Sequence, residues 1–389
     1  MLMITLLLAV LGLVMVYSAS AVVAEKRFHD SAYFLKRQLA WLTFGFLLLQ
    51  AASRIDYPAW RRGALPILAV TACLLALVLL PPIGVAAKGA RRWLHVGAIS
   101  VQPAEIAKLA TVIYLAAYLA RKQRRMSRFT WGVVPPLVIV GLLSGLILLQ
   151  PDLGTVLVIG LVSLALLFLG GASLKHLFAL IPLLAILVTL AIWKAPYRLQ
   201  RLLIFLDPGK DPTGAGFQMH QSFLAFGSGG PFGVGLGESK QKLFFLPEAH
   251  TDFVLALVGE ELGLWGSAGI VLMFAALVFK GFQIAARARE PFGRYLALGV
   301  TLLIGVQVLI NAGVVTGLLP TKGLTLPFVS YGGSSLVVSL LSVGILLSIS
   351  RDRQGGRQTV EYSETRADET GHRGWRHGRP SLSRRRPRP

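Results

Sequence analysis

Long uninterrupted apolar runs dominate the pattern of hydrophobic and polar positions along this chain. We find ten of them, at residues 1–20, 36–53, 64–82, 104–121, 131–150, 153–172, 175–194, 252–280, 293–317 and 329–350. A helix of about 20 residues crosses the ~30 Å hydrocarbon core of a bilayer. The pattern therefore predicts an all-α polytopic membrane protein of about ten transmembrane helices, with a large outer loop at about 195–251 between the seventh and eighth.

The composition of the chain supports a membrane protein. Hydrophobic residues fill 54% of the 389 positions and charged residues only 15%, whereas a soluble domain is about 25% charged. The first run ends in VYSASA, which resembles a signal-peptide cleavage site, but no Lys or Arg precedes it and nine runs follow. We therefore expect this run to remain as the first span. A lone cysteine, Cys73, excludes an intramolecular disulfide.

Basic residues collect in every second connection, and this asymmetry predicts the orientation. With the N-terminus in the cytoplasm, the inner segments hold Arg54, Arg61, Arg62, Arg121, Lys122, Arg124, Arg125, Arg128, Lys175, Lys280, Arg287, Arg289 and Arg294. Lys and Arg concentrate on the cytoplasmic side of membrane proteins, so we expect both termini there. The Arg-rich segment 351–389 is then a disordered cytoplasmic tail beside anionic lipids, rather than a nucleic-acid-binding segment.

A few basic residues depart from this rule and face outward. Lys88, Arg91 and Arg92 follow the third run, and Lys322 precedes the last one. Together with Trp93, which suits the headgroup level of a membrane, these cations predict a site for an anionic lipid head such as a diphosphate.

Glu105 and Lys108 lie inside the fourth run. Their spacing of three residues puts them on one helix face, where they can pair. Ionisable residues at membrane depth face a cavity or each other, and buried pairs also serve as structural devices. The sequence leaves both roles open for this pair.

Carboxylates cluster at the start of the eighth run, in PEAHTDFVLALVGEELG at 247–263. Glu248 and Asp252 lie at its outer end, whereas Glu260 and Glu261 would lie roughly 12–14 Å farther along one continuous helix. We expect Glu260 and Glu261 to hold the bundle together by pairing with buried cations or hydroxyls, with Lys108 as one candidate partner.

Two turn segments are expected to be structural. In QPDLGT, at 150–155, Asp152 is placed to cap the sixth helix. The glycine-rich GSGGPFGVGLG, at 227–237, lacks the Gly-Lys-Ser/Thr of a phosphate-binding loop. We therefore expect its glycines to make tight turns on the membrane surface.

Several segments resemble the SEDS family, the polytopic glycosyltransferases that polymerise bacterial peptidoglycan. They are VMVYSAS, KGARRWL, QPAEIAKL, QPDLGT, LPEAHTDFVLALVGEELG and LPTKGLTLPFVSYGGSS, which occur in the family's order over nearly all of residues 1–350. The last two look more like the division members than the elongation members. Ala104 stands where Ser is common in the family, and we expect no loss of activity from so small a difference.

The resemblance implies that lipid II is polymerised at the outer face of the bacterial cytoplasmic membrane, with inversion and release of undecaprenyl diphosphate. Asp252 matches the family's essential aspartate, and we expect it to take the proton from the acceptor's 4-hydroxyl as general base; His250 is a weaker candidate. The expected substrate-binding residues are Lys88, Arg91, Arg92, Trp93, Glu105, Lys108, Glu248, Lys322 and Ser330.

The resemblance also implies partners, namely a class B penicillin-binding protein and other division proteins. No cofactor follows from the sequence; a divalent cation could assist the diphosphate, although we see no metal-ligand cluster. Three alternatives remain open at this point. They are an elongation member of the same family, a lipid II flippase and a scaffold without activity, and only a polymerase makes glycan strands from lipid II.

Overall fold

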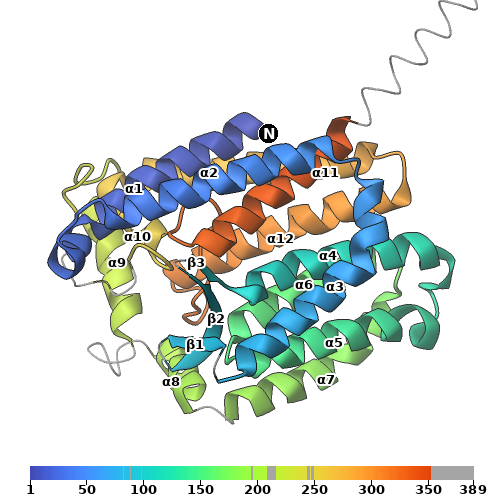
Figure 1. Ribbon diagram of the computed structural model, residues 1–389. Coiled ribbons are helices and arrows are strands. Elements are labelled where there is room, and N and C mark those ends of the chain that lie inside the picture. The colour runs from blue at the N-terminus through green and yellow to red at the C-terminus, as the bar shows by residue number, and fades with distance from the viewer. Residues whose placement is uncertain are drawn as a thin grey trace, which may run out of the picture.

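The computed structural model describes residues 1–81, 83–87, 89–97, 99–193, 196–207, 216–242, 246 and 249–351. Helices make up most of this part of the chain, and the long ones lie side by side in a bundle (Figure 1). They are α1 (Leu2–Phe28), α2 (Tyr33–Arg54), α3 (Pro58–Leu79), α4 (Pro103–Lys122), α5 (Val134–Leu148), α6 (Leu153–Leu169), α7 (Leu174–Trp193), α8 (Pro196–Leu206), α9 (Phe217–Gly229), α10 (Val254–Glu261), α11 (Gly263–Arg287), α12 (Pro291–Val315) and a C-terminal helix, Gly333–Arg351.

The predicted multi-pass helical architecture is confirmed. Seven of the described helices are long and apolar enough to cross a membrane, namely Leu2–Phe28, Pro58–Leu79, Pro103–Arg125, Phe129–Leu148, Gly263–Arg287, Pro291–Val315 and Gly333–Arg351. The other three predicted runs coincide with α2, α6 and α7. Of these, α6 has only 17 residues, and α2 carries Lys36 and Arg37 near its start.

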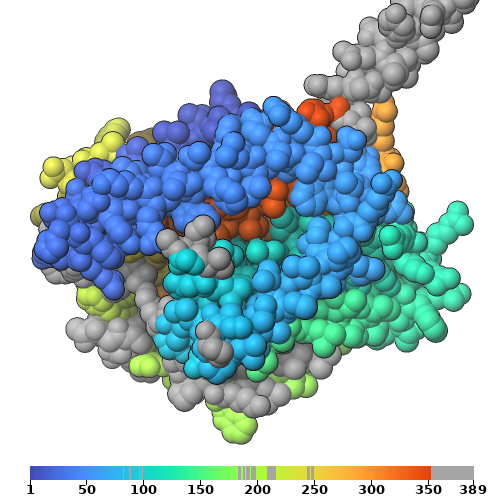
Figure 2. Space-filling view, in the orientation of Figure 1, coloured from blue at the N-terminus to red at the C-terminus, as the bar shows by residue number. Residues whose placement is uncertain are grey.

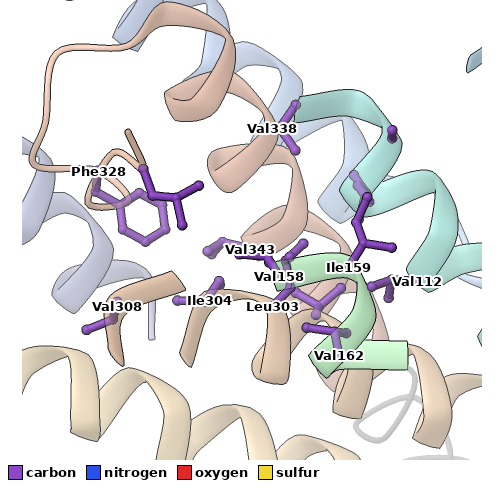
Figure 3. Close-up of a cluster of buried hydrophobic side chains, with 14 of the residues drawn as sticks. Val112, Val158, Ile159, Val162, Leu303, Ile304, Val308, Phe328, Val338 and Val343 are labelled. Atoms are coloured by element: carbon purple, nitrogen blue, oxygen red, sulfur yellow. The ribbon is translucent and has the colours of Figure 1, made fainter. Parts of the chain in front are cut away.

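Helix α4 lies at the centre of the bundle, where it packs against α3, α6 and α12. Figure 3 shows the apolar core around it, with side chains of α4, α6, α12 and the C-terminal helix, among them Val112, Val158, Ile159, Val162, Leu303, Ile304, Val308, Val338 and Val343. Gly299 lets α12 approach closely, because a Cβ there would lie 2.6 Å from Val112 Cγ1 and 2.9 Å from Leu166 Cδ1. Small residues at such contacts are typical of helices packed in a membrane, where lipid supplies no hydrophobic drive for association.

The sequence did not predict the small antiparallel sheet that follows α3. It consists of β1 (Gly84–Ala87), β2 (Ala90–Val96) and β3 (Ile99–Val101), with β2 in the middle. The sheet contacts α3 and α4, and its residues reach the surface of the face shown in Figure 2, in cyan beside α3. The predicted outward cations Arg91 and Arg92 therefore lie on a strand.

The predicted continuous helix over 252–280 is wrong. Helix α10 ends at Glu261, and α11 begins at Gly263, whose φ of +69° breaks the helix. The glycine-rich segment 227–237 packs against this break, since Val234 N donates to Glu260 O (2.9 Å) and Gly235 N to Glu261 O (3.1 Å). A Cβ at Gly233 would overlap Glu261 O. These glycines thus serve close backbone packing as well as the turns that the sequence predicted.

Candidate active site

Asp252 lies in the turn before α10, where two other parts of the chain meet this turn. Its carboxylate rests on the segment between α12 and the C-terminal helix, because a Cβ at Gly323 would lie 3.1 Å from Asp252 Oδ2. Asn311 of α12 donates from Nδ2 to Asp252 O at 2.9 Å. Tyr331 N donates to His250 O at 2.9 Å. Asp252 itself is half-buried, so its carboxylate is held in a defined place while remaining partly exposed.

The segment 318–332 that supports Asp252 is non-helical, and neighbouring side chains satisfy part of its backbone. Ser330 Oγ accepts from Leu326 N at 2.9 Å, and Gln38 Nε2 donates to Ser330 O at 3.2 Å. Arg201 of α8 donates to Thr321 O at 3.3 Å. Irregular backbone at membrane depth needs such protein partners.

Two predicted substrate-binding residues, Lys322 and Ser330, lie on this segment 318–332. Lys322 is half-buried and precedes Gly323, so it lies close in sequence to the point of contact with Asp252. Ser330 is 3% exposed, and its hydroxyl already binds the backbone of the segment. This position favours a role of Ser330 in shaping the segment over the predicted contact with substrate.

The two arginines of β2 have different surroundings. Arg92 donates from Nε to Gln150 O at 2.8 Å and from its terminal nitrogen to Pro151 O at 2.5 Å. It therefore ties the sheet to the turn between α5 and α6. Arg91 is exposed and Trp93 is half-buried. Arg91 is thus the better candidate of the two arginines for an anionic ligand, whereas the sequence treated them alike.

The turn between α5 and α6 joins this sheet to the start of the C-terminal helix. Asp152 accepts from Thr155 N at 3.1 Å, which confirms the predicted N-cap of α6. Gln102, just before α4, donates from Nε2 to Asp152 Oδ2 at 3.4 Å, and its backbone N donates to Ser334 Oγ at 3.0 Å. A chain of polar contacts thus runs from Arg92 to the start of the C-terminal helix, which follows the segment that supports Asp252.

Glu105 and Lys108 form the predicted ion pair, with Lys108 Nζ 2.8 Å from Glu105 Oε2. Lys108 is 1% exposed and Glu105 6%. An ammonium so deeply buried needs its carboxylate, because an uncompensated charge in an apolar interior is costly. The burial favours the structural alternative over the predicted contact with substrate.

Glu260 and Glu261 pair with hydroxyls and cations, as the sequence predicted. The prediction that Lys108 is one of their partners is wrong, because Lys108 pairs with Glu105. Glu261 Oε1 accepts from Ser18 Oγ of α1 at 2.6 Å and lies 3.4 Å from Lys242 Nζ. Glu260 accepts from Ser239 Oγ and from Lys240 N. Both carboxylates thus fix the far end of α10 to α1 and to segment 239–242.

An aromatic cluster borders His250. The ring of Phe34 lies 5.0 Å from His250 and 5.1 Å from Tyr331, centroid to centroid. Burial raises the pKa of the Tyr331 phenol above its ordinary value of 10.0. Burial therefore favours the protonated phenol of Tyr331 at neutral pH.

Comparison with known proteins now gives the family. Residues 1–355 match the FtsW/RodA/SpoVE family, described as cell cycle proteins. The chain belongs to this family. The predicted resemblance to SEDS proteins is thereby confirmed.

Members of the family resemble the chain over most of its length. It is 50% identical over 344 residues to the probable peptidoglycan glycosyltransferase FtsW of Geobacter metallireducens, covering 88% of this chain and 92% of that protein. A solved peptidoglycan synthase complex contains a chain that is 32% identical with a TM-score of 0.75, covering 90% of this chain and 97% of that one. Thermus thermophilus RodA is 29% identical with a TM-score of 0.65, covering 90% and 96%.

Some of the expected site residues and ligands stay predictions. Lys88 and Glu248 lie outside the described residues, as does the predicted tail beyond Arg351. Within the described ranges, no group of three or more His, Cys, Asp and Glu side chains could hold a metal ion. The divalent cation that could assist a diphosphate stays a prediction.

The sequence reasoning missed Asn311. A buried amide within the apolar stretch VLINAGVV of α12 is a usable signal, because polar residues at membrane depth are costly and usually have a role.

Proposed function

We propose that this chain is a peptidoglycan glycosyltransferase of the bacterial cytoplasmic membrane that joins lipid II units into glycan strands. The observation that carries the proposal is the place of Asp252, whose half-buried carboxylate rests on segment 318–332 beside the start of α10. The Geobacter relative, a probable peptidoglycan glycosyltransferase that is 50% identical over 88% of this chain, supports the proposal.

In the proposed reaction, Asp252 acts as the general base. Its carboxylate accepts the proton of the acceptor's 4-hydroxyl while that oxygen attacks the anomeric carbon of the donor. The bond from this carbon to the diphosphate breaks, undecaprenyl diphosphate leaves, and the configuration inverts. A carboxylate can perform this step only where the substrate can reach it, and the half-buried position of Asp252 fits this need.

Two cations of the site region would stabilise the leaving diphosphate. Lys322 lies on the segment that supports Asp252, and Arg91 is exposed on β2. Charge-assisted hydrogen bonds from such groups to phosphate oxygens are roughly twice as strong as neutral ones. We therefore assign binding of the donor diphosphate to Lys322 and Arg91, with Lys88 as a third candidate.

The charge distribution supports an outward-facing site. The basic turns around 121–128 and 287–294 lie at one end of the bundle, and the sheet and α9 lie toward the other (Figure 1). Since Lys and Arg concentrate on the cytoplasmic side, we infer that the end with Asp252 faces outward and that both termini are cytoplasmic.

We also infer the cellular setting. A division role rather than an elongation role is supported by 50% identity to FtsW against 29% to RodA. The structurally similar complex coordinates polymerization and crosslinking. This supports a class B penicillin-binding protein, together with other division proteins, as partners of this chain.

The test is direct. Purified protein given lipid II in detergent should produce glycan strands and release undecaprenyl diphosphate. A flippase would move lipid II across vesicles without forming strands, and a scaffold would do neither. Intact lipid II after incubation with folded protein and its partner transpeptidase would reject the proposed activity.

A further inference from the structure

Asn311 joins two non-helical segments that are distant in sequence. It lies four residues before the end of α12 and is 2% exposed. Its Nδ2 donates to Asp252 O at 2.9 Å and to Leu324 O at 2.7 Å. Both protons of one amide group are thus used, one on each segment.

The assignment of the amide nitrogen follows from chemistry. Both partners are carbonyl oxygens, which only accept hydrogen bonds, so the reverse orientation would set Asn311 Oδ1 against two acceptors. A buried amide is costly unless its donors are bonded. The two backbone carbonyls therefore account for the amide at this buried position.

The two joined segments meet at the Asp252 carboxylate. One segment holds Asp252, two residues before the start of α10, and the other holds Lys322, Gly323 and Leu324. The side chain of Asp252 rests on Gly323, with 3.1 Å between Oδ2 and the position of a Cβ. A shift of either segment would therefore change the direction of the carboxylate relative to the segment beneath it.

We propose that Asn311 is a positioning residue for the transfer reaction. It holds the backbone of Asp252 against the segment of Lys322 and so fixes the distance between the proton-accepting carboxylate and the substrate that this segment helps to bind. The inference rests on the proposed function of Asp252 as general base. Asn311 acts through the main chain of Asp252 and has no contact with the reacting atoms in this account.

The test compares Asn311→Leu with a matched control, Gln307→Leu. Gln307 lies one turn earlier on α12 and is 3% exposed, and its Nε2 has no hydrogen-bond partner in the described part of the chain. A misplacement of about 1 Å can lower a rate about 100-fold. We expect Asn311→Leu to lower kcat for lipid II polymerisation by about that factor, with KM within about twofold of wild type. Gln307→Leu should leave both unchanged.

Several outcomes overturn the inference. Wild-type kcat in folded Asn311→Leu protein would do so, and so would an equal loss of kcat in Gln307→Leu. A loss of folded protein with unchanged turnover per folded molecule would assign Asn311 to stability alone. If Asn311→Leu fails to fold, Asn311→Ser keeps one shorter donor and should still lose kcat about tenfold or more; wild-type kcat in that variant would equally contradict the role.

A double variant separates this inference from the proposed function. If Asn311 acts through Asp252, adding Asn311→Leu to Asp252→Asn should cause no further loss of turnover. A further loss equal to that of Asn311→Leu alone would show that Asn311 acts elsewhere while Asp252 remains the base. Wild-type turnover in Asp252→Asn would reject the general base itself, and with it this inference.

Discussion

At the scale of single residues, the two neighbouring arginines of β2 show how burial and hydrogen bonding separate similar side chains. The guanidinium of Arg92 binds the carbonyls of Gln150 and Pro151, and the side chain of Arg91 is exposed. Hydrogen bonds to a charged group contribute about 1.5–3 kcal/mol each. Arg92 should therefore contribute mainly to folding, and Arg91 to binding of the substrate.

This difference gives a first prediction. Arg92→Ala should lower the melting temperature in detergent, because it leaves two carbonyls of the α5–α6 turn without their donor. Arg91→Ala should keep the melting temperature and raise KM for lipid II. Melting and turnover measured on one preparation of each variant check this. If both variants changed the melting temperature and KM alike, the assignment of Arg92 to folding and Arg91 to substrate binding would be contradicted.

At the scale of elements, the break between α10 and α11 decides where Asp252 lies. Helix α10 is held at one end by Asn311 and at the other by Glu260 and Glu261. The glycine-rich segment 227–237 fills the break, since Gly233 has φ +81° and lies against the Glu261 carbonyl. Loosening this packing should disturb the helix that follows Asp252.

A pair of glycine variants tests this packing. Gly233→Ala puts a Cβ into an occupied place and strains a left-handed backbone, which costs about 1–3 kcal/mol for the strain alone. It should lower both the melting temperature and turnover. Gly227→Ala is the control, because a Cβ there meets nothing within 4 Å. Equal melting temperatures of the two variants would contradict the role of Gly233 in packing the break between α10 and α11.

The break and the sheet also mark the limit of prediction from the sequence. Apolar runs predicted the long helices because length and hydropathy suffice for a span. The run 252–280 hid the break, since Gly263 is an ordinary residue of membrane helices and only its contacts with Gly233 and Pro231 reveal it. The strands, of 4, 7 and 3 residues, are too short for a pattern of alternation to be recognised.

The candidate site was predictable only in part. Asp252 and Lys322 could be found from the family's motifs, because these are local in sequence. The hydrogen bonds of Arg92 to carbonyls and of Asn311 to Asp252 depend on contacts across more than 50 positions, since Arg92 to Gln150 spans 58 and Asn311 to Asp252 spans 59. No local pattern specifies such pairs.

At the scale of the whole molecule, the family match covers residues 1–355 and leaves most of the Arg-rich tail outside it. The motifs that carry the proposed chemistry lie before residue 336. We therefore predict that residues 1–350 form the catalytic part and that the tail at 351–389 is not needed for polymerisation.

Removal of the residues beyond Arg353 should leave polymerisation in detergent unchanged. The truncated protein should also keep its melting temperature, because the helices that form the core end by Arg351. Strand length on gels and the rate of undecaprenyl diphosphate release are the measurements. A folded truncated protein that makes no glycan would place part of the activity in the tail.

The most direct test of the whole account is the turnover of purified Asp252→Asn protein with lipid II. The substitution keeps the shape of the side chain and removes the proton acceptor. Since a general base contributes about 10²–10⁴-fold, turnover should fall by at least about 100-fold. Lipid II binding and melting should match the wild-type protein, because Lys322, Arg91 and the backbone contact with Asn311 remain. Wild-type turnover in a folded, substrate-binding variant would contradict the account.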